Sequence, residues 1–155
     1  MSLKPLVAHA LSIFNSGASY HANNYFFNYQ INLVQSEERF GATIEMLLEE
    51  RRRNSFPEKP SRFQSLFVCK SVRDAAWFRG FSKSPIDTPI FEIHALTGWH
   101  RGDMRLLNMN CTPVELSYRL DLYWKGMTDQ TSEGTPPFWE ILIPLPAKVG
   151  KKVQE

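Results

Sequence analysis

The segment Phe138-Trp139-Glu140-Ile141-Leu142-Ile143-Pro144-Leu145 decides the expected fold. It is a short apolar run that follows the loop Thr128–Pro137, and such runs between turn signals are typical of buried strands. The run falls far short of the ~20 residues that a membrane-spanning helix needs. We therefore expect a final strand in the core, with one carboxylate, Glu140, among apolar neighbours.

Earlier parts of the chain predict further strands. Arg62–Cys69 ends in a short apolar run, and Pro89–Leu96 alternates between a more polar and a more apolar face. Ser19–Ala22 and Phe27–Val34 are rich in aromatic and β-branched residues, which favour extended structure. Gly98–Gly102 is interpreted as a loop.

Helices are predicted between these strands. Glu37–Arg53 follows the cap residue Ser36, with acidic residues in its first turn and arginines in its last. A second helix runs from Ser71 to Phe78, and a third begins at Thr112-Pro113 and ends at Gly126. The first fifteen residues favour one more helix, and Asp103–Leu107 favours a single helical turn. The faces expected to be buried are Phe40, Ile44, Leu47 and Leu48 in the first helix, and Leu116, Leu120, Tyr123 and Trp124 in the third.

Composition predicts one domain over residues 1–155. The chain has 155 residues, of which 43% are hydrophobic and 13% aromatic, so it is long enough to bury a core. A net charge of +2 is too small to predict nucleic-acid binding by itself. Because the first residues lack an export signal, Cys69 and Cys111 are expected to be reduced thiols in a cytoplasmic protein.

The familiar catalytic motifs are absent from the sequence. It contains no GxGxxG, Walker A, HExxH, CxxC or GxSxG pattern. His94, His100 and Asp103 are close in sequence but match no metal-site spacing, so no metal site is predicted. The basic runs Arg51–Arg53 and Lys148–Lys152 are typical of solvated surface, and nucleic-acid contact through them stays an alternative.

Three separated segments resemble the ADP-ribosyltransferase superfamily. They are Tyr20-His21, the strand and helix of Arg62–Phe78, and Phe138–Pro144 with Ala147-Lys148-Val149 after it. Their order matches that of the superfamily. There, a strand that carries a Tyr-His pair or an Arg comes first, and a glutamate opens a late strand. The resemblance covers about residues 19–150. The central part is similar to an uncharacterised bacterial family within this superfamily, through His94, Trp99–Met104 and Tyr123–Gly126.

The resemblance implies an α+β fold with a split, mostly antiparallel sheet, flanking helices and a cleft. It implies a domain that binds NAD and could transfer ADP-ribose to an unidentified acceptor. Glu140 resembles the catalytic glutamate, which would stabilise the positive charge that develops as the nicotinamide–ribose bond breaks. His21 resembles the residue that positions NAD. Arg62 and Ser65 are secondary candidates, for the pyrophosphate and for a ribose hydroxyl.

The chain departs from the superfamily pattern at three points. It has no Ser-Thr-Ser triplet, no aromatic residue matched to the nicotinamide-stacking position, and Phe138 where a Glu or Gln usually selects an arginine acceptor. Modification of arginine is therefore disfavoured. Trp77, Phe78 and Tyr123 could stack on a ring, but aromatic residues at helical spacing are more often part of a core.

Two simpler interpretations stand beside the transferase hypothesis. Glu140 could be a carboxylate that pairs with Lys or Arg, and His21 could be a hydrogen-bonded structural histidine, since function must be argued from a site. The whole chain could also be a non-enzymatic module that binds a protein or nucleic acid on the same fold. Salt-dependent binding would mark the nucleic-acid version.

Overall fold

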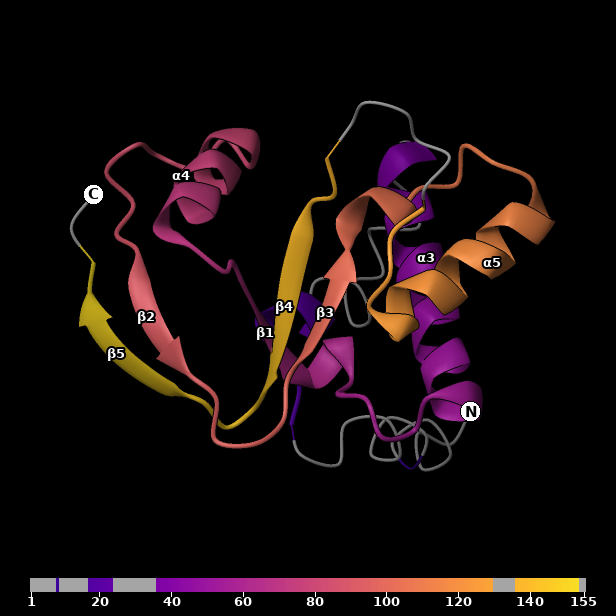
Figure 1. Cartoon of the computed structure of the whole chain (residues 1–155), viewed down its shortest axis with the longest axis horizontal. Coiled ribbons are helices and arrows are strands. Elements are labelled where there is room, and N and C mark those ends of the chain that lie inside the picture. Colours follow the sequence, from indigo (N-terminus) through magenta and orange to yellow (C-terminus); the bar gives the residue numbers. More distant parts are fainter. Residues whose placement is uncertain (1–7, 9–16, 24–35, 130–135, 154–155) are drawn as a thin grey trace.

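The described strands form two small antiparallel sheets. The computed structural model describes Ala8 and residues 17–23, 36–129 and 136–153. In the first sheet, β4 (Trp139–Pro144) lies between β1 (Ser65–Val68) and β3 (His100–Asp103). In the second, β2 (Phe91–His94) pairs with β5 (Lys148–Lys152), and Figure 1 shows this pair beside the first sheet. The expected α+β class with antiparallel sheets is confirmed.

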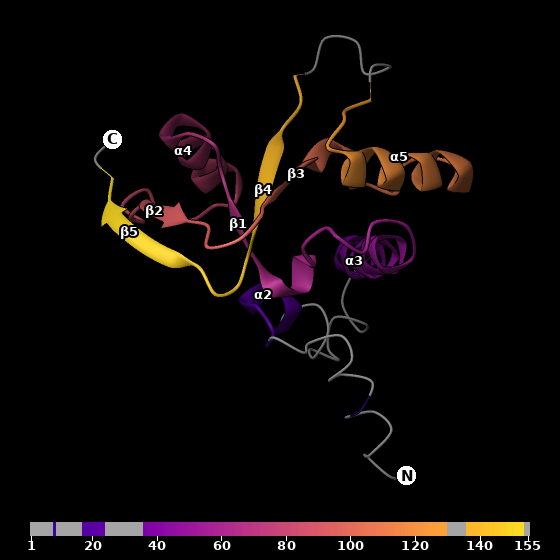
Figure 2. The ribbon, with the colours of Figure 1, turned by 60° about the horizontal axis from the view of Figure 1, so that its bottom comes forward.

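Helices lie at both sides of the three-stranded sheet. α3 (Ser36–Ser55) and α5 (Pro113–Lys125) contact each other beside β3, whereas α4 (Val72–Phe81) lies on the side of the second sheet (Figures 1 and 2). In the described part of the chain, no helix combines the length and apolar composition that a membrane crossing needs. The buried core cluster consists of Ile44, Leu48, Leu106, Leu116, Leu120, Leu122, Tyr123, Trp124 and Leu142.

The predicted start of α4 and both predicted ends of α5 are confirmed, whereas α4 continues to Phe81, past the predicted end at Phe78. Ser71 caps α4 by accepting a hydrogen bond from the backbone N–H of Asp74. Thr112 and Glu115 form a reciprocal capping box at the start of α5, and Gly126 ends that helix in a left-handed conformation with φ of 68°. These ends were predictable because each cap depends only on residues within one turn.

The buried face of α3 differs from the prediction. Ile44 and Leu48 are buried as expected, but Leu47 is 38% exposed, and the side chain of Phe40 lies outside the described part. Glu45 and Glu49 are buried instead. The face is therefore rotated toward two carboxylates. Glu49 pairs with Arg52, one turn along the helix, whereas Ser61 and Arg62, the other partners, are not placed near them by the sequence pattern.

Other predictions need correction. Ser19–Ala22 is not extended, because the Ser19 hydroxyl accepts from the Ala22 N–H and caps a single helical turn, α2 (Tyr20–Ala22). Gly98–Gly102 is not all loop, since His100–Asp103 forms β3 against β4. Lys148–Lys152 forms the strand β5, and its lysines are exposed, as expected of a solvated basic run. The predicted helix in the first fifteen residues and the strand Phe27–Val34 lie outside the described residues.

The aromatic residues of α4 are not core residues. No residue of α4 is buried, and Trp77 is 54% exposed, although its ring lies 4.6 Å from that of Phe138. Tyr123 of α5 is fully buried, as expected. The two cysteines, Cys69 and Cys111, are free thiols, as expected.

Candidate functional site

All four residues selected from the sequence line one cavity. His21, Arg62, Ser65 and Glu140 border a hollow of about 640 Å³ between the first sheet and α3. Small-molecule sites usually enclose roughly 300–1,000 Å³ and have mostly apolar walls. This cavity has such walls, formed by Ile44, Leu66, Phe67, Val68, Phe78, Leu107, Phe138 and Trp139 among others.

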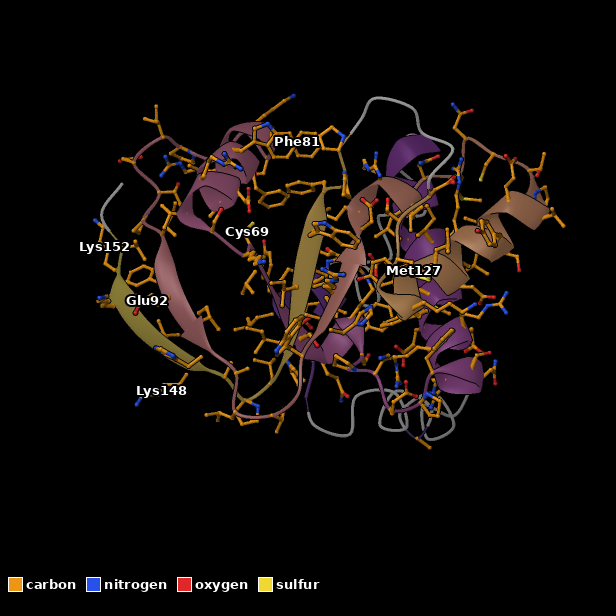
Figure 3. All side chains as sticks on the ribbon, in the orientation of Figure 1. Cys69, Phe81, Glu92, Met127, Lys148 and Lys152 are labelled. Carbon is orange, nitrogen blue, oxygen red and sulfur yellow. The ribbon has the colours of Figure 1, made fainter. Side chains whose placement is uncertain are left out.

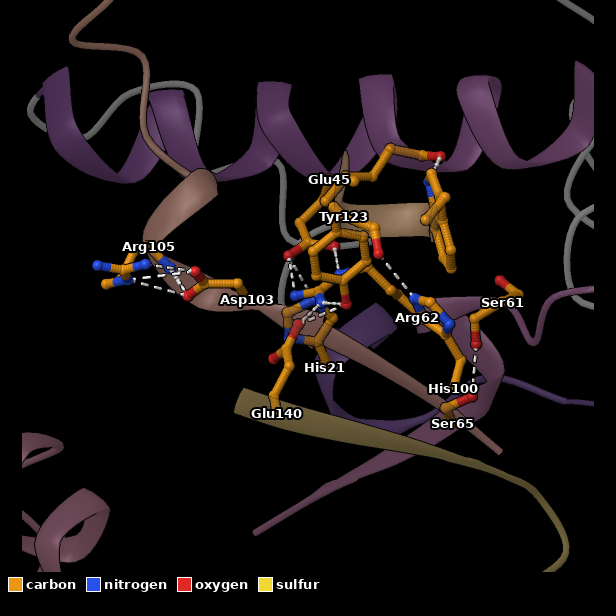
Figure 4. A network of polar contacts seen from close by, with 12 residues as sticks. His21, Glu45, Ser61, Arg62, Ser65, His100, Asp103, Arg105, Tyr123 and Glu140 are labelled. Carbon is orange, nitrogen blue, oxygen red and sulfur yellow. Dashed lines mark hydrogen bonds and ion pairs between the residues drawn. The ribbon is translucent and has the colours of Figure 1, made fainter. Parts of the chain in front are cut away.

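Arg62 lies at the centre of a buried ionic cluster (Figure 4). It belongs to η3 (Arg62–Gln64), the short helical turn that precedes β1. Its Nε and Nη2 each donate to the Glu45 carboxylate at 2.7 Å, while Nη1 donates to the Glu140 carboxylate and to the Tyr123 hydroxyl. Burial acts to lower the pKa of Arg62, but the two carboxylates hold it well above its usual range. The guanidinium is therefore charged, and each of its three nitrogens donates to another residue of the protein.

Glu140 is held by one of its two carboxylate oxygens. Its Oε1 accepts from the Tyr123 hydroxyl at 2.5 Å and from Arg62. No described residue donates to Oε2, and the carboxylate lines the cavity. Because Glu140 sits on the central strand β4, opposite Gly102 of β3, its position is fixed by the sheet. The carboxylate thus has a structural ion-pair partner and also one oxygen available to a ligand.

Tyr123 reaches this cluster from α5. Burial and the Glu140 carboxylate raise the pKa of Tyr123 well above 10, against the opposing effect of Arg62. The phenol is therefore neutral and can donate to Glu140. Gly102 makes room for the ring, since a Cβ at that position would lie 2.1 Å from a Tyr123 ring carbon.

His21 and Glu45 form the opposite part of the cluster. The His21 Nε2 lies 3.2 Å from the Glu45 Oε1, and the imidazole lies 4.6 Å from the Phe67 ring. Burial acts to raise the pKa of Glu45, but Arg62 and His21 outweigh burial and lower it to about 2. Glu45 is therefore ionised at neutral pH.

Ser65 has a role within the fold. Ser65 is 1% exposed, and its hydroxyl donates to the Ser61 carbonyl at 2.7 Å. The Ser61 hydroxyl in turn donates to Glu49, which also binds Arg52. These contacts fix the turn that carries Arg62 into the cavity, so both secondary candidates have their polar groups engaged by other protein residues.

Comparison with known proteins places the chain in a family. The model of the family described as "Protein of unknown function (DUF2441)" matches residues 7–155. The chain belongs to the DUF2441 family. A search of curated proteins gave no match. Family membership therefore leaves the activity open, and the ADP-ribosyltransferase resemblance stays a prediction for this DUF2441 protein.

The sequence reasoning missed two members of the DUF2441 site, Glu45 and Tyr123. Tyr123 was expected only as a core residue, because its hydroxyl partners lie 17 and 61 residues away along the chain. Glu45 carried a usable signal. It directly follows the buried Ile44 and lies one turn before the buried Glu49, so the two carboxylates flank the apolar face.

Two of the three residues considered for a metal site, His100 and Asp103, serve the fold of this DUF2441 protein. The His100 Nε2 lies 3.0 Å from the Tyr123 carbonyl, and burial lowers the pKa of His100 to about 4. Asp103 is fully buried and accepts hydrogen bonds from Arg105, Thr128 and the Phe138 N–H. Among the described residues, no three His, Cys, Asp or Glu side chains gather where they could hold a metal ion.

Proposed function

We propose that the cavity binds NAD and that Glu140 assists transfer of ADP-ribose to an unidentified acceptor. The observation that carries the proposal is the Glu140 carboxylate, fixed through one oxygen by two donors at the wall of a cavity of about 640 Å³. The same cavity is lined by His21, Arg62 and Ser65. Assignment of the fold to the ADP-ribosyltransferase-like class, in a cytoplasmic protein, belongs to the same proposal.

The chemistry requires a fixed negative charge. When the nicotinamide–ribose bond breaks, nicotinamide leaves with the bonding electrons and positive charge develops on the ribose. The acceptor nucleophile then bonds to that carbon and releases a proton. A carboxylate that is already oriented stabilises such charge better in a water-poor site than in water. Glu140 meets this requirement because its partners and its strand leave it little freedom to reorient.

Other residues take supporting roles in this proposal. Arg62 orients Glu140 instead of binding the pyrophosphate, since its donors contact Glu45, Glu140 and Tyr123. His21 borders the ligand space with its imidazole against Phe67. Ser65 maintains the turn before β1.

The test is NAD cleavage and binding by a charge-neutral variant. Glu140→Gln keeps the shape of the side chain, so the variant should still bind NAD, and its affinity measured by titration calorimetry should fall far less than its turnover. Nicotinamide release should fall by at least ~100-fold, the scale seen when one stabilising group is removed from a transition state. Glu92→Gln is the matched control, because this glutamate lies on β2 with 40% of its side chain exposed. Equal turnover in all three proteins, or no NAD binding by the wild type, contradicts the proposal.

Nucleic-acid binding is the second candidate, favoured by the surface of β5. Lys148, Lys151 and Lys152 are exposed there, and Figure 3 shows Lys148 and Lys152 at the outer edge of the second sheet. Lys151 lies 3.7 Å from Glu92, which partly offsets its charge. A labelled oligonucleotide that binds less tightly as salt rises, and less tightly to Lys148→Gln/Lys152→Gln, would favour this candidate.

A further inference from the structure

The cluster at the wall of the cavity carries more negative than positive charge. Glu45 and Glu140 are ion-paired with a single guanidinium, that of Arg62, and the Tyr123 phenol is neutral. The formal sum of these groups is one negative charge. All four residues are buried, with exposed fractions of 6%, 4%, 3% and 0% for Glu45, Glu140, Arg62 and Tyr123.

The described walls of the cavity supply little to balance this charge. Of the described residues that line it, only Arg62 and His21 have basic side chains. His21 lies 3.2 Å from Glu45 and cancels the excess only when its imidazole is protonated. A buried charge without a full counter-charge is unfavourable, so a positively charged group that enters the cavity gains from the imbalance.

Aromatic walls add to the preference for a cation. Phe67, Phe78, Phe138 and Trp139 line the same cavity, and the faces of aromatic rings attract positive charge. Phe67 already takes part in one such contact, with the Arg62 guanidinium carbon 4.6 Å from its ring centroid. Apolar aromatic walls around an excess negative charge fit a flat organic cation better than a neutral ring of the same shape.

We infer that the cavity selects a ligand whose planar ring is positively charged, and that Glu45 sets this selectivity. The inference rests on the proposed function for its natural ligand: oxidised NAD carries a cationic nicotinamide ring, whereas the ring of NADH is neutral. Glu45 is then a specificity-determining residue. It acts through the charge of the cluster, while Glu140 faces the ribose.

The experiment compares ligands that differ mainly in ring charge. Binding of 1-methylnicotinamide, a cation, and of nicotinamide, its neutral counterpart, is measured by titration calorimetry or ligand-observed NMR. NAD and NADH form the second pair. All four measurements are made at pH 8. We expect each cation to bind about tenfold more tightly than its neutral partner, given one excess charge within several ångströms in a partly desolvated site.

The variant Glu45→Gln removes the excess charge with little change of shape. It should bring both affinity ratios toward one. Glu49→Gln is the matched control, because Glu49 lies one turn further along α3, is 4% exposed and does not line the cavity. The ratio should stay unchanged in that control. A purely structural effect of Glu45→Gln would weaken both members of a pair and leave their ratio unaltered.

The outcomes separate this inference from the proposed function. Equal binding of 1-methylnicotinamide and nicotinamide by the wild type overturns the inference even if NAD binds. A cation preference that persists in Glu45→Gln overturns the role of Glu45. Preference for 1-methylnicotinamide without NAD binding supports the charge selectivity and contradicts the proposed function. If none of the four ligands binds, both are overturned. Should Glu45→Gln fail to fold, the wild-type ratios still decide on charge selectivity.

Discussion

At the scale of single residues, the Tyr123 hydroxyl holds the ionic cluster together. It accepts from Arg62 and donates to Glu140, each at 2.5 Å. Tyr123→Phe removes both bonds while keeping the ring, so the free energy of unfolding should fall by ~1–3 kcal/mol, the usual effect of leaving buried polar groups with fewer partners. Urea unfolding measures this. Tyr118→Phe on the same helix, 58% exposed, should change the free energy by less than ~0.5 kcal/mol, and equal losses would contradict the assigned role.

Gly102 gives a second prediction at this scale. A methyl group there would overlap the Tyr123 ring, which is packed in the core and cannot move freely. Gly102→Ala should therefore lower the free energy of unfolding by ~1–3 kcal/mol or more through overpacking. Gly98→Ala is the control, since a Cβ at Gly98 meets no atom within 4 Å. Thermal melts that show no difference between the two variants would contradict the close approach of β3 to α5.

At the scale of elements, the start of α5 depends on one side chain. The Thr112 hydroxyl accepts from the Glu115 N–H, and the Glu115 carboxylate accepts from the Thr112 N–H. Thr112→Ala should destabilise the protein by ~1 kcal/mol, as loss of an N-cap usually does, whereas Thr112→Ser keeps the hydroxyl and most of the stability. The difference is measured from urea midpoints. Equal midpoints for the two variants would show that the cap contributes nothing.

Elements whose signals are local could be predicted, and those that depend on distant partners could not. The caps at Ser71 and Thr112 and the apolar run of β4 are readable from neighbouring residues. The sequences of β3 and β5 have only weak strand patterns. β3 forms because β4 offers it a hydrogen-bonding edge, and β5 forms because β2 does. The rotation of α3 toward Glu45 likewise depends on an arginine 17 residues away.

The site was predictable in part for the same reason. Residue types and chain order were enough to select His21, Arg62 and Glu140, and the structure brings them to one cavity. The ion pair between Arg62 and Glu140 could not be predicted, since the two residues are 78 residues apart in the sequence. From the sequence, Glu140 could be either a catalytic carboxylate or a structural one, and these were competing interpretations. In the structure, one oxygen of Glu140 is ion-paired with Arg62 and the other oxygen is open.

At the scale of the whole molecule, acid should lower the stability of the protein over two separate pH ranges. Burial lowers the pKa of His100 from its ordinary 6.5 to about 4, so the unfolded chain binds this proton first and stability falls as pH drops from about 6.5 to 4. The loss is at most ~3 kcal/mol. Glu45 is an acid, and its pKa is lowered from 4.5 to about 2. Its contribution to the free energy of unfolding is therefore present above pH 4.5 and disappears as pH falls through 2.

The variant His100→Gln isolates the first of these pH ranges. It lacks the titrating imidazole, so its free energy of unfolding, measured with urea at pH 7.5, 6 and 5, should vary less with pH than that of the wild type. The quantity to compare is the slope of the free energy of unfolding against pH. The free energy itself will be lower in the variant at every pH, because the bond to the Tyr123 carbonyl is lost. Identical slopes would contradict a buried, neutral His100.

The central claim is that NAD occupies the cavity beside Glu140, and the two cysteines offer a direct test in the wild-type protein. Cys69 lines the cavity, whereas Cys111 does not, and both are partly exposed free thiols (Figure 3 shows Cys69). The measurement is the rate of alkylation of each cysteine by iodoacetamide, followed by mass spectrometry with and without millimolar NAD. We predict that NAD slows alkylation of Cys69 several-fold and leaves Cys111 unchanged. An unchanged rate at Cys69 would contradict the account.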